Sequence, residues 1–122
     1  VQKVAIGNPA SVPVGRYSQR ALEAAKLWPA VQAKAIHTQN VRQSLDYVAR
    51  GEVEAGFVYH TDVLVQKGKV HVAFTVPQAE VIHYPIAPAA NSSHIVEARQ
   101  FVNYVLSPAG QAILAQHGFL KP

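Results

Sequence analysis

The side chains that most often perform catalysis or bind metals are few and scattered in this sequence of 122 residues. Cysteine is absent, which excludes disulfides, thiolate metal sites and cysteine nucleophiles. The six histidines do not pair four residues apart on any expected helix, and no carboxylate stands near them at ligand spacing. Gly7 and Gly15 are too far apart for a nucleotide-binding loop. We therefore expect neither an enzyme nor a metal centre, and no cofactor.

The sequence offers uncharged hydrogen-bond donors instead. One helix is expected to start near Val14 and another near Val41, each directly after a predicted strand. The first turn of a helix carries N–H groups without an intrahelical acceptor and the positive end of the helix dipole, a combination that binds anions. Pro13 and Gly15 are expected to let an anion approach the backbone closely. Tyr59 ends the apolar stretch "GFVY", and its hydroxyl can donate a hydrogen bond. Side chains or water cap most helix starts, so spacing alone leaves both interpretations open.

Alternating strands and helices must position these donors. Hydrophobic periodicity predicts the following elements before residue 77: strands at Val4–Ile6, Ala35–Thr38, Ala55–Tyr59 and Val70–Val76, and helices at Gly15–Leu27, Val41–Ala49 and Val63–Gln66. Asn40 is expected to cap the second helix, Thr61 or Asp62 the third, and Gly51 and Gly68 to end them. Short alternating units predict an α/β fold with a largely parallel sheet between helices. In such sheets ligands bind where the strands end and the helices begin.

The last third of the chain has a different pattern. A strand broken by prolines is expected over Ile82–Ala87, followed by two consecutive helices. Ser93 is the expected cap of the first, whose buried face would hold Ala98, Phe101, Val102 and Val105. The second would begin at Ser107-Pro108 and end at Gly118, with Phe119 packing on Leu114. Two helices and one strand cannot cover their own apolar faces, so partner strands are expected from elsewhere.

Composition and charge indicate a packed domain rather than a particular partner. Hydrophobic residues make up 49% of the chain, and the formal charge of +4 is spread along its length. We interpret these cations as a solvated surface rather than a nucleic-acid interface. No segment has the length of a membrane span, and the N-terminus lacks the pattern of a secretory signal. Any targeting segment is expected to have been removed.

Four segments together resemble a known family. The stretches "AIGNPASVPVGRYSQRALEAAKLW", "NVRQSLDYVARGEVEAGFVYHTD", "YPIAP" and "LSPAGQAILAQHGF" are similar in order and spacing to the periplasmic molybdate-binding proteins of bacterial ABC transporters. The resemblance covers nearly the whole chain. It implies a two-lobed periplasmic-binding-protein fold of type II, with about residues 1–81 as the oxyanion-binding second lobe and 82–122 as a C-terminal strand and helices returning to an incomplete first lobe.

The resemblance also implies which atoms bind the ligand. In that family a tetrahedral oxyanion lies between the lobes, and here the donors would be the backbone N–H groups of Val14 and Val41 and the hydroxyl of Tyr59. Two further donors, serines of the first lobe, would precede Val1. Molybdate at neutral pH is a fully deprotonated dianion, so a site made only of donors suits it, and tungstate of nearly the same size would fit equally. Asp62 is interpreted as a capping or hinge residue, and Arg16 and Arg42 as surface residues.

The resulting hypothesis is that the chain belongs to the periplasmic solute receptor of a molybdate importer, which delivers the anion to a membrane permease. The alternative is the effector-sensing domain of a transcription regulator with the same fold. Because donors are missing, we expect this chain alone to bind molybdate weakly. The uncovered apolar faces after residue 82 are expected to pair with the missing N-terminal segment or with a second copy.

Overall fold

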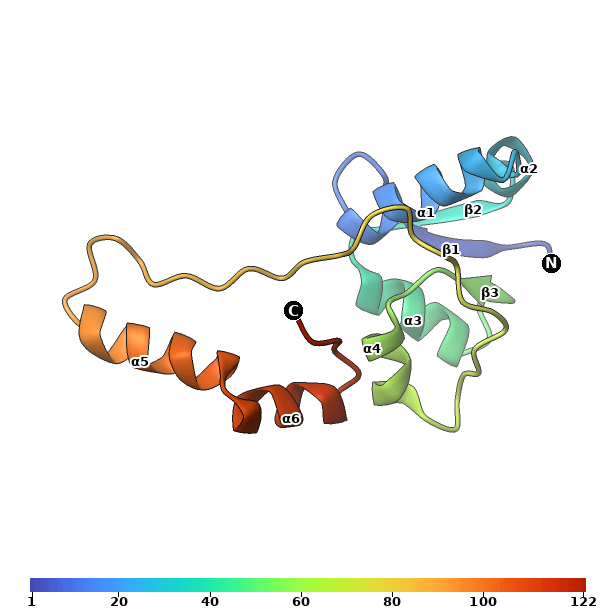
Figure 1. The fold of residues 1–122 in the computed structure, drawn as a ribbon. Helices are drawn as coiled ribbons and strands as arrows, with labels where there is room; N and C mark the ends of the chain where they lie inside the picture. The colour runs from blue at the N-terminus through green and yellow to red at the C-terminus, as the bar shows by residue number, and fades with distance from the viewer. The chain divides into compact units, whose positions relative to one another are not determined.

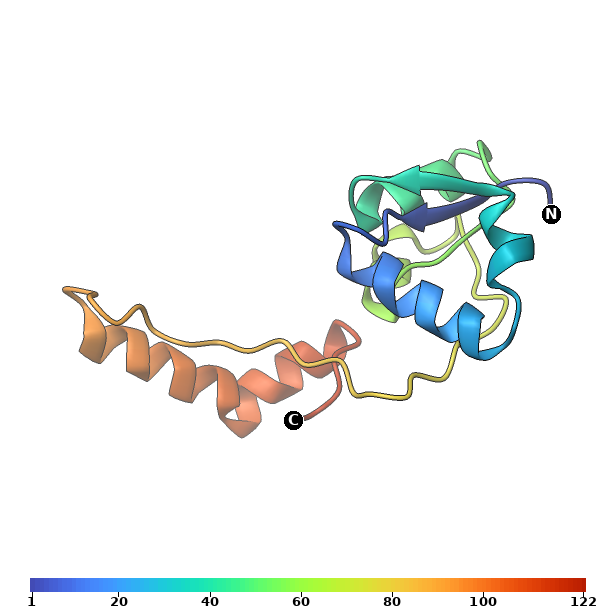
Figure 2. The ribbon, with the colours of Figure 1, turned by 90° about the horizontal axis from the view of Figure 1, so that it is seen from above.

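Three short parallel strands form the sheet, in the order β2-β1-β3. The structure, a computed structural model, describes residues 1–122 and divides them into two units, 1–80 and 81–122, of which the first holds the sheet. Strand β1 (Val4–Gly7) pairs along its length with β2 (Ala35–Thr38), while β3 (Ala55–Gly56) pairs with Val4 and Ala5. Figure 2 shows β1 and β2 side by side. The predicted α/β class with a parallel sheet is confirmed.

Helices cover both faces of this sheet (Figure 1). Helix α1 (Pro13–Ala24) and the short α2 (Trp28–Gln32) that follows it connect β1 to β2. Helix α3 (Val41–Ala49) connects β2 to β3. The chain therefore moves from β1 to one neighbour and then past β1 to the other. Helices α1 and α3 lie on opposite faces (Figure 1), as right-handed crossovers to opposite neighbours require. A single turn, α4 (His60–Val63), continues into the 3-10 helix η1 (Leu64–Gln66) after β3.

The core consists of two apolar layers against β1, whose four residues are all buried. On one face Val4 and Ile6 pack with Leu22 of α1 and with the partly buried Trp28 and Phe57. On the other face Leu45 of α3 is buried. The alternation of side chains along a strand explains this division, since successive residues point to opposite faces.

Several predicted boundaries of the first unit are confirmed. The Asn40 side chain accepts a hydrogen bond from the Gln43 N–H and caps α3. Gly51 and Gly68 follow the helices with positive φ, which glycine adopts without strain. Helix α1 begins two residues before the predicted Gly15 and ends three before Leu27. Helix α2 is absent from the prediction, because Pro29 has the pattern of a terminator although proline is tolerated in a first helical turn.

Two strand predictions are wrong, and a third is too long. The segment Val70–Val76 forms no strand, and its only bridge joins Val70 to Lys67. Ile82–Ala87 forms no strand either, and Ala55–Tyr59 shortens to β3. Each segment has the side-chain pattern of a strand, but a strand also needs a neighbour to satisfy its backbone N–H and C=O groups. This chain supplies such a neighbour only for β3, along the first half of β1.

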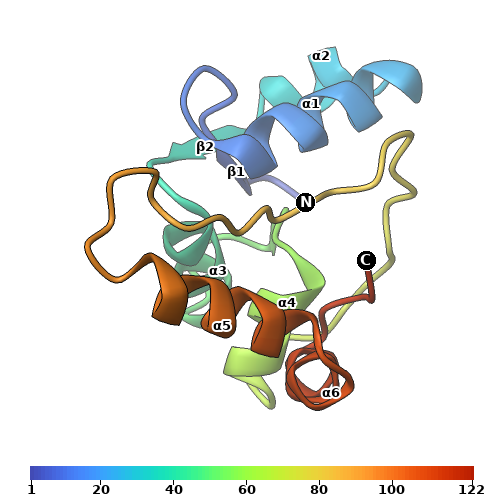
Figure 3. The same ribbon diagram turned by 60° about the vertical axis from the view of Figure 1, so that its left-hand side comes forward.

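The second unit consists of helices α5 (Ile95–Leu106) and α6 (Pro108–Gln116), which form a corner in Figure 3. The predicted start of α6 is confirmed, since the Ser107 hydroxyl accepts from the Gly110 N–H and Pro108 is the first helical residue. The predicted ending is also confirmed, because Gly118 has positive φ and the Phe119 N–H donates to the Leu114 carbonyl. The Ser93 cap is wrong. His94 occupies that position, and its N–H donates to the Ser92 hydroxyl.

The predicted buried face of α5 is only partly buried in this chain. No residue of α5 is buried, and Phe101 is 61% exposed. The amphipathic spacing is present, and Ala98, Val102 and Val105 of that face are partly buried. None of them reaches full burial, because α6 meets α5 only around the corner that Gln111 closes by donating to the Val105 carbonyl. No helix of the structure has both the length and the apolar character needed to cross a membrane.

Candidate anion-binding site

The carboxyl ends of the three strands lie at one edge of the sheet. Helix α1 follows β1, α3 follows β2 and α4 follows β3, so all three helices begin at this edge. The Asn8 N–H donates to the Thr38 carbonyl over 2.9 Å and joins the ends of β1 and β2. Helix α1 follows β1 on one face, and α4 follows β3 on the face where it contacts α3 (Figure 1). The carboxyl ends of β1 and β3 therefore mark the switch point where open α/β sheets bind ligands.

Val14 lies in the first turn of α1. Val12 occupies the cap position in an extended conformation, no side chain caps the helix, and Pro13 is its first residue. Val14 is therefore the second helical residue, and its N–H has no carbonyl acceptor within the helix. Val14 is buried, with 5% of the residue exposed, so its position is fixed by packing.

Gly15 makes this placement of α1 possible. A methyl group built on Gly15 would overlap the carbonyl oxygen of Gly7, so only glycine lets the helix lie directly against the end of β1. The sequence predicts that Gly15 lets an anion approach the backbone closely. The structure gives it a packing role between helix and strand.

Val41 is the first residue of α3, so its N–H also lacks an intrahelical acceptor. The Asn40 side chain accepts its hydrogen bond from the Gln43 N–H, three residues further along. A buried hydrogen bond of 2.7 Å between the Thr38 and Ser44 hydroxyls ties the end of β2 to α3. The start of α3 is thus fixed by hydrogen bonds from residues before and after Val41 in the sequence.

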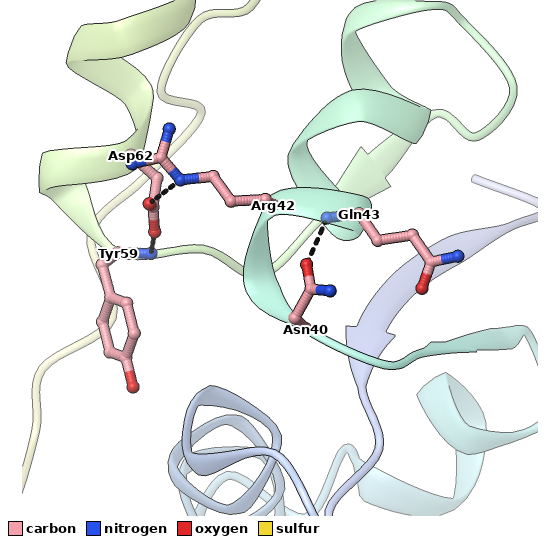
Figure 4. A network of polar contacts seen from close by, with 5 residues as sticks. All are labelled: Asn40, Arg42, Gln43, Tyr59 and Asp62. Carbon is pink, nitrogen blue, oxygen red and sulfur yellow. Dashed lines mark hydrogen bonds and ion pairs between the residues drawn. The ribbon is translucent and has the colours of Figure 1, made fainter.

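Tyr59 directly precedes α4 and is partly buried. Its backbone N–H donates to the Asp62 carboxylate over 3.2 Å, and the other oxygen of that carboxylate lies 3.2 Å from Arg42 Nε (Figure 4). In the figure the Tyr59 ring points away from this ion pair. The expected capping by Thr61 or Asp62 is wrong in detail, because Tyr59 is the cap residue and Asp62 binds its N–H from the first turn. The interpretation of Asp62 as a capping residue is confirmed in that sense.

The structure therefore places Val14, Val41 and Tyr59 at one edge of one sheet, each after a different strand. Their role as ligands stays a prediction. Sequence reasoning missed the ion pair of Arg42 with Asp62, because the two residues are twenty positions apart and only the packing of α3 beside α4 brings them together. Among the described residues, no group of three or more His, Asp or Glu side chains is placed to hold a metal ion.

Comparison with known proteins identifies relatives along almost the whole chain. The sequence profile of a family described as bacterial extracellular solute-binding protein matches residues 1–120. A Bacillus subtilis protein provisionally named an ABC transporter substrate-binding lipoprotein is 37% identical over 123 residues, which cover 97% of this chain and 46% of that protein. The molybdate-binding protein ModA of Haemophilus influenzae is 32% identical over 117 residues, covering 95% of this chain and 46% of the relative.

A solved structure has the same fold. It comes from Clostridium difficile and is provisionally described as the substrate-binding domain of a molybdenum ABC transporter. It matches with a TM-score of 0.74 and 30% identity, over 100% of this chain and 54% of that one. The chain spans about half the length of the relatives it matches. The resemblance inferred from the four sequence segments is confirmed, and so is the expected type of lobe.

Proposed function

Because this chain belongs to the bacterial extracellular solute-binding protein family, we propose that it binds a tetrahedral oxyanion, molybdate or tungstate, as part of the receptor of an ABC importer. One observation carries the proposal. Val14 and Val41 in the first turns of α1 and α3, and Tyr59, all follow the carboxyl ends of neighbouring strands. A relative that covers the same residues is named a molybdate-binding protein.

The chemistry of these donors suits a dianion without protons. Two helix starts supply N–H groups and the positive ends of two helix dipoles, and a phenol supplies an O–H. The proposed set contains no carboxylate that could accept a hydrogen bond from the ligand. A protonated anion such as hydrogen phosphate would therefore leave its O–H without a strong acceptor and bind more weakly. Tungstate presents nearly the same size and the same acceptors, and both ions are proposed as ligands.

Transport is the proposed context. The family consists of solute-binding proteins rather than enzymes, and its description places it outside the cytoplasm. We propose a periplasmic location and a membrane permease as the partner that receives the anion. Residues 1–81 would form the second lobe, and 82–122 would complete a first lobe whose other part lies in sequence that this chain does not include. Closure of the two lobes over the anion would favour the bound state.

The exposed apolar side chains of the second unit support this division. Val96 and Phe101 of α5, and Leu120 after α6, are among its exposed large apolar residues. A family relative of about twice the length has further chain that could cover such faces, and a second copy is the other candidate. The Bacillus subtilis relative and the Clostridium difficile structure are both named for ABC transporters, which favours the receptor over a transcription regulator.

Nuclear magnetic resonance titration tests the proposal on the chain itself. With only part of the site present, we expect affinity in the range of about 1 mM. Adding molybdate to the ¹⁵N-labelled protein should move the amide signals of Val14 and Val41 with one common saturation curve. Tungstate should give the same curve.

Sodium chloride at matched ionic strength is the control for general anion effects, and it should leave these two amides in place. Phosphate should bind more weakly than molybdate. Signals of Val14 and Val41 that stay fixed in molybdate while amides elsewhere respond would refute the proposed site.

A further inference from the structure

Asp62 is the one charged side chain buried in this structure. The other buried polar residues are Ser18, Thr38 and Ser44, which carry hydroxyls. The Asp62 side chain is 7% exposed, whereas that of its partner Arg42 is 58% exposed. Burying a carboxylate is costly unless it is paired and hydrogen-bonded, so the contacts of Asp62 must offset its desolvation.

Each oxygen of the Asp62 carboxylate contacts a different structural element. Oδ2 accepts from the backbone N–H of Tyr59, and Oδ1 lies 3.2 Å from Nε of Arg42 (Figure 4). Arg42 directly follows Val41 in the first turn of α3. The Asp62 carboxylate therefore links Arg42, the neighbour of the proposed donor Val41, to the backbone of the proposed donor Tyr59.

The same carboxylate is a hazard for an anion site. A bare negative charge beside Tyr59 would repel a bound dianion, and repulsion between like charges is weakly screened when one of them is buried. The Arg42 guanidinium neutralises that charge from the exposed side. Arg42 is thus placed to balance Asp62 rather than to contact the ligand.

We infer that Arg42 and Asp62 form a charge-compensated clip, which positions Tyr59 relative to the start of α3 and prevents the Asp62 charge from opposing the anion. The claim that Arg42 keeps the Asp62 charge from opposing the anion rests on the proposed function. The claim that the pair positions Tyr59 concerns the protein without ligand. Both residues are positioning residues in this account, and neither contacts the anion.

Hydrogen exchange of the Tyr59 amide tests the clip without any ligand. Removing the acceptor in Asp62→Ala should accelerate that exchange at least about tenfold, whereas Asp62→Asn keeps an oxygen acceptor and should preserve most of the protection. Unchanged exchange in Asp62→Ala would overturn the clip.

Molybdate titrations of the charge variants test the compensation. In Arg42→Gln the buried carboxylate loses its counter-ion, and we expect about tenfold weaker binding. In Asp62→Asn the guanidinium remains without the carboxylate, and binding should tighten about threefold. The double variant should recover at least about fivefold of the loss seen in Arg42→Gln. A purely structural ion pair would instead weaken binding in both single variants and give no recovery.

Arg50→Gln is the matched control, because Arg50 follows the same helix and pairs with Glu52 at 3.2 Å on the surface. It should bind molybdate like the wild type. If the wild type responds to molybdate but Arg42→Gln binds equally well, the compensation is wrong and the proposed function stands. If the wild type shows no response at Val14 and Val41, the proposed function fails and the compensation fails with it, while the exchange result still decides the clip.

Discussion

Gly15 in the first turn of α1 lies against the backbone of Gly7 at the end of β1, so closely that a methyl group on Gly15 would overlap the Gly7 carbonyl oxygen. Gly7 is constrained in turn, since a Cβ there would lie 2.7 Å from a methyl of Val12. These two glycines let the helix begin immediately beside the strand. The position of the Val14 amide at the edge of the sheet depends on this contact.

Gly15→Ala should be strongly destabilising, with a loss of about 3 kcal/mol or more in the free energy of unfolding, because backbone atoms cannot move aside as a flexible side chain can. Gly51→Ala is the comparison. Gly51 has φ of 71°, but a methyl group there would meet nothing within 4 Å, so only backbone strain of about 1 kcal/mol is expected. Urea denaturation measures both, and equal losses would contradict the packing role of Gly15.

The buried hydrogen bond between Thr38 and Ser44 should be strongly coupled. Thr38→Val leaves the fully buried Ser44 hydroxyl without this partner and should cost about 1–3 kcal/mol. Replacing both residues, as Thr38→Val with Ser44→Ala, should cost less than the sum of the two single changes. A double-mutant cycle in urea checks this, and strict additivity would count against the bond.

Glu54 should make stability depend on pH in the acid range. The backbone N–H groups of Lys3 and Gln2 donate to its carboxylate over 2.8 and 3.2 Å, and the Lys3 bond is the main reason that the pKa of Glu54 is lowered. A lowered folded-state pKa stabilises the protein above the unfolded value, and this contribution is lost as pH falls through the folded value.

Glu54→Gln should therefore be slightly less stable than the wild type at neutral pH, and the two proteins should converge in acid below the carboxyl range. Urea midpoints between neutral pH and about pH 3 would follow this convergence. A constant difference between the two midpoints across that range would show that the carboxylate contributes nothing specific.

Tyr59→Phe should weaken molybdate binding at least about tenfold, since a hydrogen bond to a charged group contributes about 1.5–3 kcal/mol. Tyr47→Phe removes a phenol from α3 whose hydroxyl accepts from Gln43 Nε2, and it should leave binding intact. The same amide titration reports both variants. Wild-type affinity in Tyr59→Phe would remove the phenol from the proposed donor set.

Local rules predicted most helix ends of this fold. Asn40, Ser107, Gly51 and Gly118 act within a few residues of their own position, so their effects can be inferred from neighbouring sequence alone. The short apolar run Val4–Ile6 likewise predicted a buried strand from local sequence, and all four residues of β1 are buried. The prediction that helix starts and Tyr59 share one edge followed from these elements and from the parallel arrangement of the sheet.

Features that depend on distant partners could not be predicted in the same way. The pattern of Val70–Val76 has the period of a strand, but pairing requires a neighbouring strand that no local rule supplies. Phe101 has the spacing of a buried residue, and its exposure reflects what surrounds α5 rather than its own sequence. The ion pair of Arg42 with Asp62 and the contact of Gly15 with Gly7 arise only when folded elements meet.

The most direct test of the account is a crystal structure of the chain soaked in tungstate, with the anion located by its anomalous scattering. The account predicts one tungstate at the carboxyl edge of the sheet, with its oxygens accepting hydrogen bonds from the N–H groups of Val14 and Val41 and from the Tyr59 hydroxyl. A fully occupied tungstate that contacts none of these three groups would contradict it.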